Sequence, residues 1–149
     1  MDSQDFFTIV IKSSSKTLTT DKTNNCSIRM KCPSQFNYIQ VHGVSLYADF
    51  PTNITFNGLF AELIANDIDI YDSFDTKNGP LKTLAFENTT RLTVDRANMN
   101  FKCGNFNNKT INFQLLNETG VLLKEVGTVF TTDYDRPWVC VLKCKGLME

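Results

Sequence analysis

The segment FTIVIK at residues 7–12 places a strongly apolar side chain at every second position, and so does WVCVLKC at residues 138–144. Successive side chains of a β-strand point to opposite faces, so a period of two predicts strands with one face buried. Runs of this kind recur between the two segments. The chain is therefore predicted to be all-β from end to end.

Turn-forming stretches rich in Asn, Gly, Pro and Ser separate the strand-like runs. Strands are predicted at residues 5–12, 26–31, 37–47, 53–56, 63–71, 81–86, 91–94, 98–102, 110–116, 121–126 and 138–144. The pair 110–116 and 121–126, joined by Asn-Glu-Thr-Gly, is the clearest hairpin. Residues 60–65 fit either a helical turn or the start of the next strand. Many short strands at this spacing predict a two-sheet antiparallel sandwich, which we expect to be a single jelly roll.

Length and composition fit one folded domain over residues 1–149. A chain of this length buries roughly 70% of the surface that its unfolded form exposes. With 42% hydrophobic and 21% charged residues, it is too apolar to be disordered. Fifteen Lys and Arg balance sixteen Asp and Glu without any basic block, so nucleic-acid binding is not expected.

The first residues and the cysteines predict where the protein is made. The opening MDSQDFF is acidic where a secretory signal is basic, and no apolar run approaches the ~20 residues that span a bilayer. We therefore expect synthesis in a reducing compartment, no secretion and no membrane span. The five cysteines are odd in number and form no C-x-x-C motif, so buried free thiols are expected. Because no secretory signal is expected, no glycan is expected at the five sequons, which begin at Asn25, Asn53, Asn88, Asn108 and Asn117.

Residue types that commonly catalyse reactions or bind metals do not form recognisable motifs in the sequence. His42 is the only histidine, and it shares a strand face with Gln40, opposite Ile39 and Val41, which favours a solvent-facing position. A catalytic Cys–His pair that the fold brings together remains an alternative, although nothing in the sequence indicates which cysteine would belong to it. The acidic stretch at residues 66–75 reads as a solvated face, with a calcium site as the alternative. We therefore predict no catalytic residue, no metal and no cofactor.

Two sets of apolar residues have predicted positions. The core is expected to contain Phe7, Ile9, Ile11, Ile39, Val41, Phe113, Leu115, Trp138, Cys140 and Leu142, which lie on the more apolar side of their strands. The last strand is apolar on its other face too, at Val139 and Val141. One face of a sandwich strand normally meets solvent, so we predict that these two valines contact another chain. The alternative is that a loop or a neighbouring strand of the same chain covers them.

The opening third of the chain resembles a known family. FTIVIK, a polar connection, SIRM at residues 27–30 and YIQVHGVSL at residues 38–46 are similar to the start of small jelly-roll capsid proteins. INFQLLN at residues 111–117, followed by the segment at 138–142, resembles their last hairpin. These are penton and minor capsid proteins of the adenovirus-like lineage of double-stranded DNA viruses, including virophage and giant-virus relatives.

The resemblance implies a structural subunit of the virion that is not an enzyme. Such a subunit assembles with itself, as a pentamer at vertices, or lies as a minor protein between larger major capsid proteins. The alternative is a ligand-binding β-sandwich, such as a lectin-like or adhesion module. That alternative requires aromatic side chains at one loop end, for which the candidates are Tyr71, Phe74, Tyr134 and Trp138.

Overall fold

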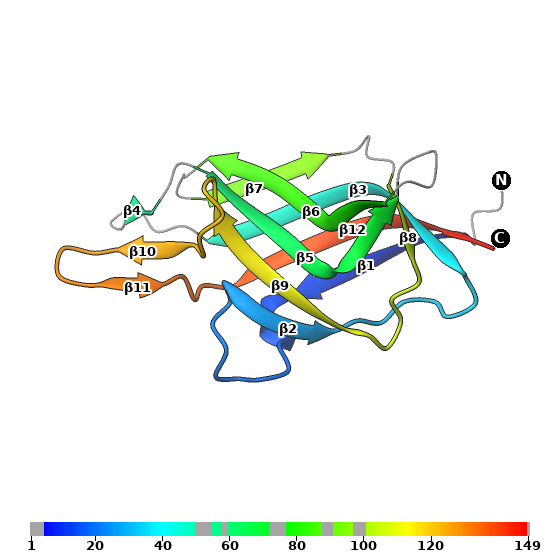
Figure 1. Cartoon of the computed structure of the whole chain (residues 1–149), viewed down its shortest axis with the longest axis horizontal. Coiled ribbons are helices and arrows are strands. Elements are labelled where there is room, and N and C mark those ends of the chain that lie inside the picture. The colour runs from blue at the N-terminus through cyan, green and yellow to red at the C-terminus, as the bar shows by residue number, and fades with distance from the viewer. Residues whose placement is uncertain are drawn as a thin grey trace.

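Antiparallel strands form nearly all of the regular structure (Figure 1). The computed structural model describes residues 5–49, 55–57, 60–71, 77–87, 91–96 and 101–148. Within these ranges, the one helical element longer than a single residue is the 3-10 turn at Ser13–Ser15. The strands are β1 (Phe6–Lys12), β2 (Asn25–Arg29), β3 (Tyr38–Asp49), β4 (Thr55–Phe56), β5 (Phe60–Tyr71), β6 (Lys77–Glu87), β7 (Arg91–Arg96), β8 (Phe101–Gly104), β9 (Thr110–Asn117), β10 (Lys124–Val126), β11 (Thr131–Asp133) and β12 (Trp138–Leu147). The all-β prediction is confirmed.

The strand pairs are nested along the chain. The first strand, β1, pairs with the last, β12, and β2 pairs with β9. Further inward, β3 pairs with both β7 and β8, and β5 pairs with β6. The nested pairs sit side by side because β12 also pairs with β3 and β9 also pairs with β5. The result is two antiparallel groups, β1-β12-β3-β7/β8 and β2-β9-β5-β6.

The two groups join along one side and enclose the core between them. Ile70 and Tyr71 of β5 pair with Cys103 and Lys102 of β8, so nine strands form one continuous curled sheet. Within it, Lys143 pairs with Gly43 and Cys144 with Val41, which leaves His42 as an extra residue in β3. This β-bulge shifts the alternation of β3 and adds local twist.

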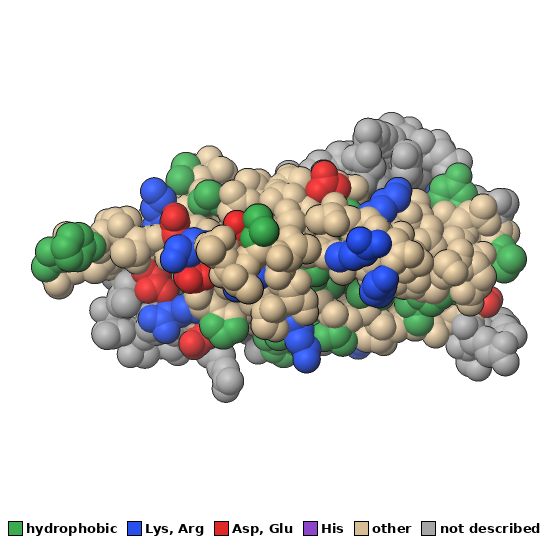
Figure 2. Space-filling model, turned by 90° about the horizontal axis from the view of Figure 1, so that it is seen from below, with side chains coloured by type: hydrophobic (Ala, Val, Ile, Leu, Met, Phe, Trp, Pro, Cys, Tyr) green, Lys and Arg blue, Asp and Glu red, His purple; other side chains and the backbone are tan. Residues whose placement is uncertain are grey.

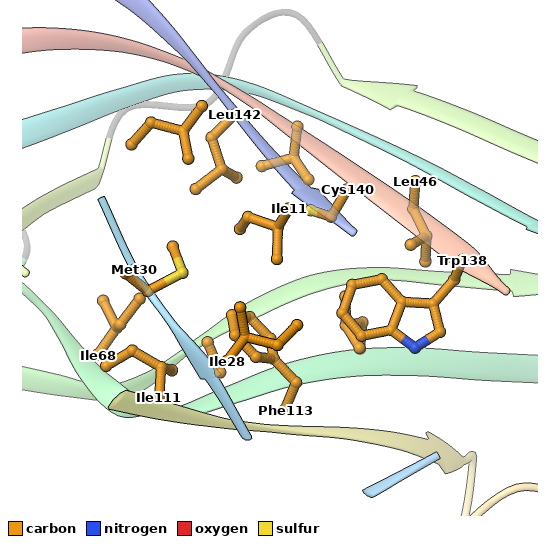
Figure 3. Packing of buried hydrophobic residues seen from close by; sticks show 14 of the residues in the cluster. Ile11, Ile28, Met30, Leu46, Ile68, Ile111, Phe113, Trp138, Cys140 and Leu142 are labelled. Carbon is orange, nitrogen blue, oxygen red and sulfur yellow. The ribbon is translucent and has the colours of Figure 1, made fainter. Parts of the chain in front are cut away.

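The core lies between the two groups (Figure 3), and it contains nine of the ten residues that the sequence predicts. Ile9, Ile11, Ile39, Val41, Phe113, Leu115, Trp138, Cys140 and Leu142 are all buried. Phe7 is half-buried and stacks on Phe36 with ring centroids 5.9 Å apart. Trp138 packs against Phe113, at 5.7 Å between centroids, and its indole N–H donates to the carbonyl of Thr23 at 2.7 Å. The polar atom of the largest core side chain is therefore satisfied.

The hairpin predicted from residues 110–116 and 121–126 forms only next to its turn, where the N–H of Asn117 donates to the carbonyl of Val121 and the N–H of Leu123 to the carbonyl of Leu115. Leu116 and Leu122 form an isolated bridge, but β10 then pairs with β11 and β4 in a separate three-stranded sheet. The reason is that β2 occupies the same edge of β9 over Thr110–Gln114, so the segment after the turn can pair only with residues 115–117. The hairpin of β10 and β11 instead projects from one end of the sandwich (Figure 1). Residues 60–65 begin strand β5, so the strand alternative is the right one there.

Candidate functional site

An apolar patch covers the middle of the outer face of β1, β12 and β3. In the register of these strands, Val141 lies opposite Val10, and Val139 lies opposite Tyr47. Residues opposite each other in antiparallel strands point to the same face, so the four side chains are neighbours. We call Val10, Tyr47, Val139 and Val141 the sheet patch.

The sheet patch faces away from the core. The inner face of β12 is closed by Trp138, Cys140 and Leu142, which are at most 1% exposed. On the outer face, Val10 is 54% and Tyr47 45% exposed, while Val139 and Val141 are half-buried between their neighbours. The outward position of the two valines follows the alternation in the sequence. Contiguous exposed apolar side chains of this kind are typical of surfaces that another protein covers.

A second apolar surface, absent from the predictions, lies at the tip of the β10–β11 hairpin. Val129 is 77% and Phe130 74% exposed, the two highest values among the described large hydrophobic residues. The tip is a closed turn in which the N–H of Gly127 donates to the carbonyl of Phe130 at 2.8 Å. A Cβ at Gly127 would approach that same oxygen to 3.0 Å, so a larger residue here would require the turn to shift slightly. The sequence feature that could have predicted this surface is the apolar pair Val129-Phe130, which comes directly after Gly127-Thr128.

The base of the hairpin is anchored to the sandwich. Arg136 Nε donates to Glu125 Oε1 at 2.6 Å. The side chain of Tyr134 is fully buried, and its hydroxyl donates to the carbonyl of Asp49 at 2.7 Å. Burial raises the pKa of Tyr134 well above its usual range. Asn24, also buried, donates its side-chain amide to the carbonyl of Leu123 at 2.9 Å. These contacts hold the hairpin in a fixed direction.

An open apolar groove of about 390 Å³ lies around His42, lined also by Phe6, Phe7, Thr8, Lys143 and Cys144. The bulge turns the His42 ring onto Phe6, with centroids 5.8 Å apart. The prediction of a solvent-facing histidine is therefore only half right, because the ring is on the outer face but is half covered. Its Nε2 atom is buried and has no hydrogen-bond partner among the described residues.

All five cysteines are free thiols. Desolvation raises the pKa of Cys26 to about 11 and the pKa of Cys103, Cys140 and Cys144 to about 12. A nucleophilic cysteine needs the opposite shift, toward the thiolate. Cys144 lines the same groove as His42, but its raised pKa does not support the open Cys–His alternative.

The other residues weighed as ligands have structural partners or lie outside the described side chains. Asp67 accepts a hydrogen bond from the backbone N–H of Asn112 at 2.7 Å. The side chains of Asp69, Asp72 and Asp75, the rest of the calcium alternative, lie outside the described part. Over the residues described, no three His, Cys, Asp or Glu side chains gather as a metal site would require. The described segments also include no helix with the length and apolarity needed to cross a membrane.

Comparisons with known proteins gave no relative for this chain. No protein family matches it, and neither the curated proteins nor the solved structures gave a significant match.

Proposed function

We propose that this chain is a structural subunit of a virion, without enzymatic activity, that assembles through the outer face of its β1-β12-β3 sheet. Its partner is a further copy of itself or a larger major capsid protein. Its role is that of a penton or minor capsid protein, made in the host cytoplasm. The single observation that carries the proposal is the sheet patch.

The nested strand order supports the jelly-roll part of this proposal. Pairing β1 with β12, β2 with β9, β3 with β7 and β8, and β5 with β6 is the arrangement of a long antiparallel ribbon folded across two sheets. A double-sheet jelly roll has eight strands in two Greek keys and occurs in viral capsid domains. We interpret β7 and β8 as one strand position, because both pair with β3 over successive residues. The family resemblance of the opening third agrees with this interpretation.

The sheet patch supports assembly because of its position. The loops at the ends of a sandwich often carry ligand sites, whereas an exposed apolar area on the face of a sheet suits contact with another protein. Val139 and Val141 stand on the strand between β1 and β3, so a partner that covers them also reaches Val10 and Tyr47. Burying such side chains contributes about 25 cal/mol per Å² of apolar surface. Polar residues Lys12 and Lys143 border the patch, which resembles the polar rim around an interface core.

The alternative of a lectin-like module loses two of its four aromatic candidates. Tyr134 and Trp138 are 0% and 1% exposed, and the polar atom of each is hydrogen-bonded to the backbone. Neither ring is available to stack on a sugar. The side chains of Tyr71 and Phe74 lie outside the described part.

Light scattering combined with native mass spectrometry of the purified chain tests the proposal. We expect a defined oligomer, or a complex of fixed stoichiometry when the major capsid protein of the same virus is added. A chain that stays monomeric at high concentration and binds no capsid protein would rule the proposal out.

A further inference from the structure

The nine-stranded sheet has two open edges with a groove between them. Its strand order begins with β1 and ends with β2, so among the described strands each of these two has a neighbour on one side only. The groove has a volume of about 290 Å³ and is lined by residues 8–12 of β1, by Ser15 and by residues 28–31. It is closed at one end, where Lys16 forms a bridge to Ile28. We call it the edge groove.

We infer that the edge groove accepts an extended segment of a partner protein, which joins the sheet as an added strand and carries apolar and acidic side chains in alternation. The inference goes beyond the proposed function, because this contact uses the edge of the sheet whereas the sheet patch lies on its outer face. Val10 belongs to both surfaces. The addition of a strand, however, uses the backbone of β1, which is not part of the sheet patch.

The backbone of β1 provides the template for an added strand. All seven of its residues pair with β12 in one register without a bulge. A regular edge strand presents a row of unpaired N–H and C=O groups, which proteins commonly protect with a bulge, a proline or charged side chains. β1 has no proline, and its single charged residue, Lys12, is at its end. Main-chain hydrogen bonds to this edge therefore supply binding, as they do wherever a peptide extends a sheet.

The floor of the edge groove favours apolar side chains at every second position of the added strand. Ile9 and Ile11 of β1, Ile28 of β2 and Met30 just after it are at most 7% exposed and belong to the core. Ile11 and Ile28 both point toward the interior (Figure 3). Side chains of a strand alternate between its two faces, so one face of the added strand meets these residues. Apolar side chains on that face extend the core.

The outer rim of the edge groove is positively charged. The exposed side chains Lys12, Arg29 and Lys31 line it, and none of the described lining residues is acidic. In the described part of the chain Lys12 and Arg29 form no ion pair, and Lys31 donates to the neutral side chain of Asn108. Figure 2 shows the molecule from below, the side on which β2 lies in Figure 1, with Lys and Arg near the middle and acidic side chains gathered toward the hairpin. The uncompensated cations favour acidic side chains on the outer face of the added strand.

A synthetic peptide tests the inference. The probe is the fluorescein-labelled peptide Ser-Val-Asp-Val-Glu-Val-Asp-Ser, and its control has lysine in place of each acidic residue. Fluorescence anisotropy measures binding to the full chain. Two further versions carry N-methyl groups, either on the valine nitrogens or on the nitrogens of the acidic residues. Because successive N–H groups of a strand point to opposite edges, each version blocks one edge of the peptide and keeps its side chains. Hydrogen exchange measured by mass spectrometry locates the contact.

Two protein variants form a matched pair. Arg29→Glu changes the rim of the edge groove, and Lys22→Glu changes an exposed cation outside it. Both alter the net charge of the chain by the same amount. Lys22 is 55% exposed, and its surface ion pair with Asp135 contributes little to stability. Circular dichroism confirms that each variant is folded, and Arg29→Gln with Lys22→Gln replaces the pair if either is not.

Strand addition predicts a specific pattern of binding. The acidic peptide binds one to one, and the lysine version does not. Arg29→Glu weakens binding at least about fivefold, because an attraction becomes a repulsion, while Lys22→Glu binds like the parent. At least one N-methyl version loses binding, and amide exchange slows in residues 8–12 when the probe is added.

Four results would overturn the inference: no binding of the probe, equal binding of the acidic and lysine peptides, undiminished binding of both N-methyl versions, or equal binding by the Arg29 and Lys22 variants. A peptide of residues 1–7 that binds more tightly than the probe would assign the edge groove to a second copy of this chain, and would overturn it too. The proposed function is judged separately, from the oligomeric state, which the peptide assay does not measure.

Discussion

Val10 of β1 lies directly opposite Val141 of β12 on the outer face of the sheet, although the two residues are at opposite ends of the chain. This pairing exists because the first and last strands of the fold are neighbours. It brings two apolar side chains together where an isolated sandwich would present polar ones. The surface that we propose for assembly is therefore a direct consequence of the nested strand order.

Replacing Phe113 by Ala tests the core. Phe113 is 2% exposed and packs against Trp138, so the substitution removes a large buried side chain and leaves a cavity. We expect a loss of about 3–5 kcal/mol in the free energy of unfolding, measured by urea denaturation. Phe130→Ala is the matched control and should change that free energy by less than about 0.5 kcal/mol, since Phe130 is exposed. A loss below about 1 kcal/mol at Phe113 would show that the ring is not in the core.

Replacing Asn117 by Ala tests the turn that directs the chain away from β9. The side-chain carbonyl of this buried residue accepts from the N–H groups of Thr119 and Val121, each at 3.0 Å, and its amide donates to the carbonyl of Asn57 at 2.9 Å. Losing these bonds leaves backbone groups without partners, which costs about 1–3 kcal/mol.

The control for Asn117→Ala is the same change at an exposed site. Asn66 donates to the side chains of Asn112 and Gln114 on the surface, where water replaces it, so Asn66→Ala should have little effect. Equal losses in chemical denaturation at the two positions would contradict a special role for the Asn117 turn.

The buried thiols predict a loss of stability at alkaline pH. Burial raises the pKa of Cys140 to about 12 from a usual value of 9.0, so the folded chain keeps a proton that the unfolded chain releases. The resulting contribution to stability is complete below about pH 9 and falls as the pH rises toward 12. Cys26, Cys103 and Cys144 act in the same direction.

A comparison of Cys140→Ala with the parent isolates this effect. The variant should be less stable at pH 7 because it loses buried volume, but its free energy of unfolding should decline less steeply between pH 8 and pH 10.5. If the free energies of unfolding of the two proteins decline in parallel as the pH rises, burial does not raise the pKa of the Cys140 thiol.

Much of the fold is predictable from the sequence because most of its strands have one buried face. The period of two in residues 7–12 and 138–144 identifies β1 and β12, and it places Ile9, Ile11 and Cys140 inward. The outward position of Val139 and Val141 follows from the same alternation. Local patterning is sufficient here because the inward residues all contact one core.

Features that depend on pairing between distant strands are not predictable in this way. β11 (Thr131–Asp133) has no buried face, since all three side chains are exposed, and it therefore leaves no alternation in the sequence. The expected pairing of β10 with β9 was wrong because β2, which comes from elsewhere in the chain, occupies that edge of β9 over Thr110–Gln114. The groove at His42 depends on a bulge, which is a mismatch between two strands and not a property of either one.

The most direct test of the central claim is the oligomeric state of Val141→Lys, measured by sedimentation beside a thermal melt. Val121→Lys is the matched control, because Val121 is 48% exposed and lies outside the sheet patch. The proposal predicts that Val141→Lys lowers the assembled mass while its melting temperature stays within about 4 °C of the parent, and that Val121→Lys changes neither. A Val141→Lys protein that melts early yet keeps the parent's assembled mass would show that the patch is covered within the chain, and the account would fail.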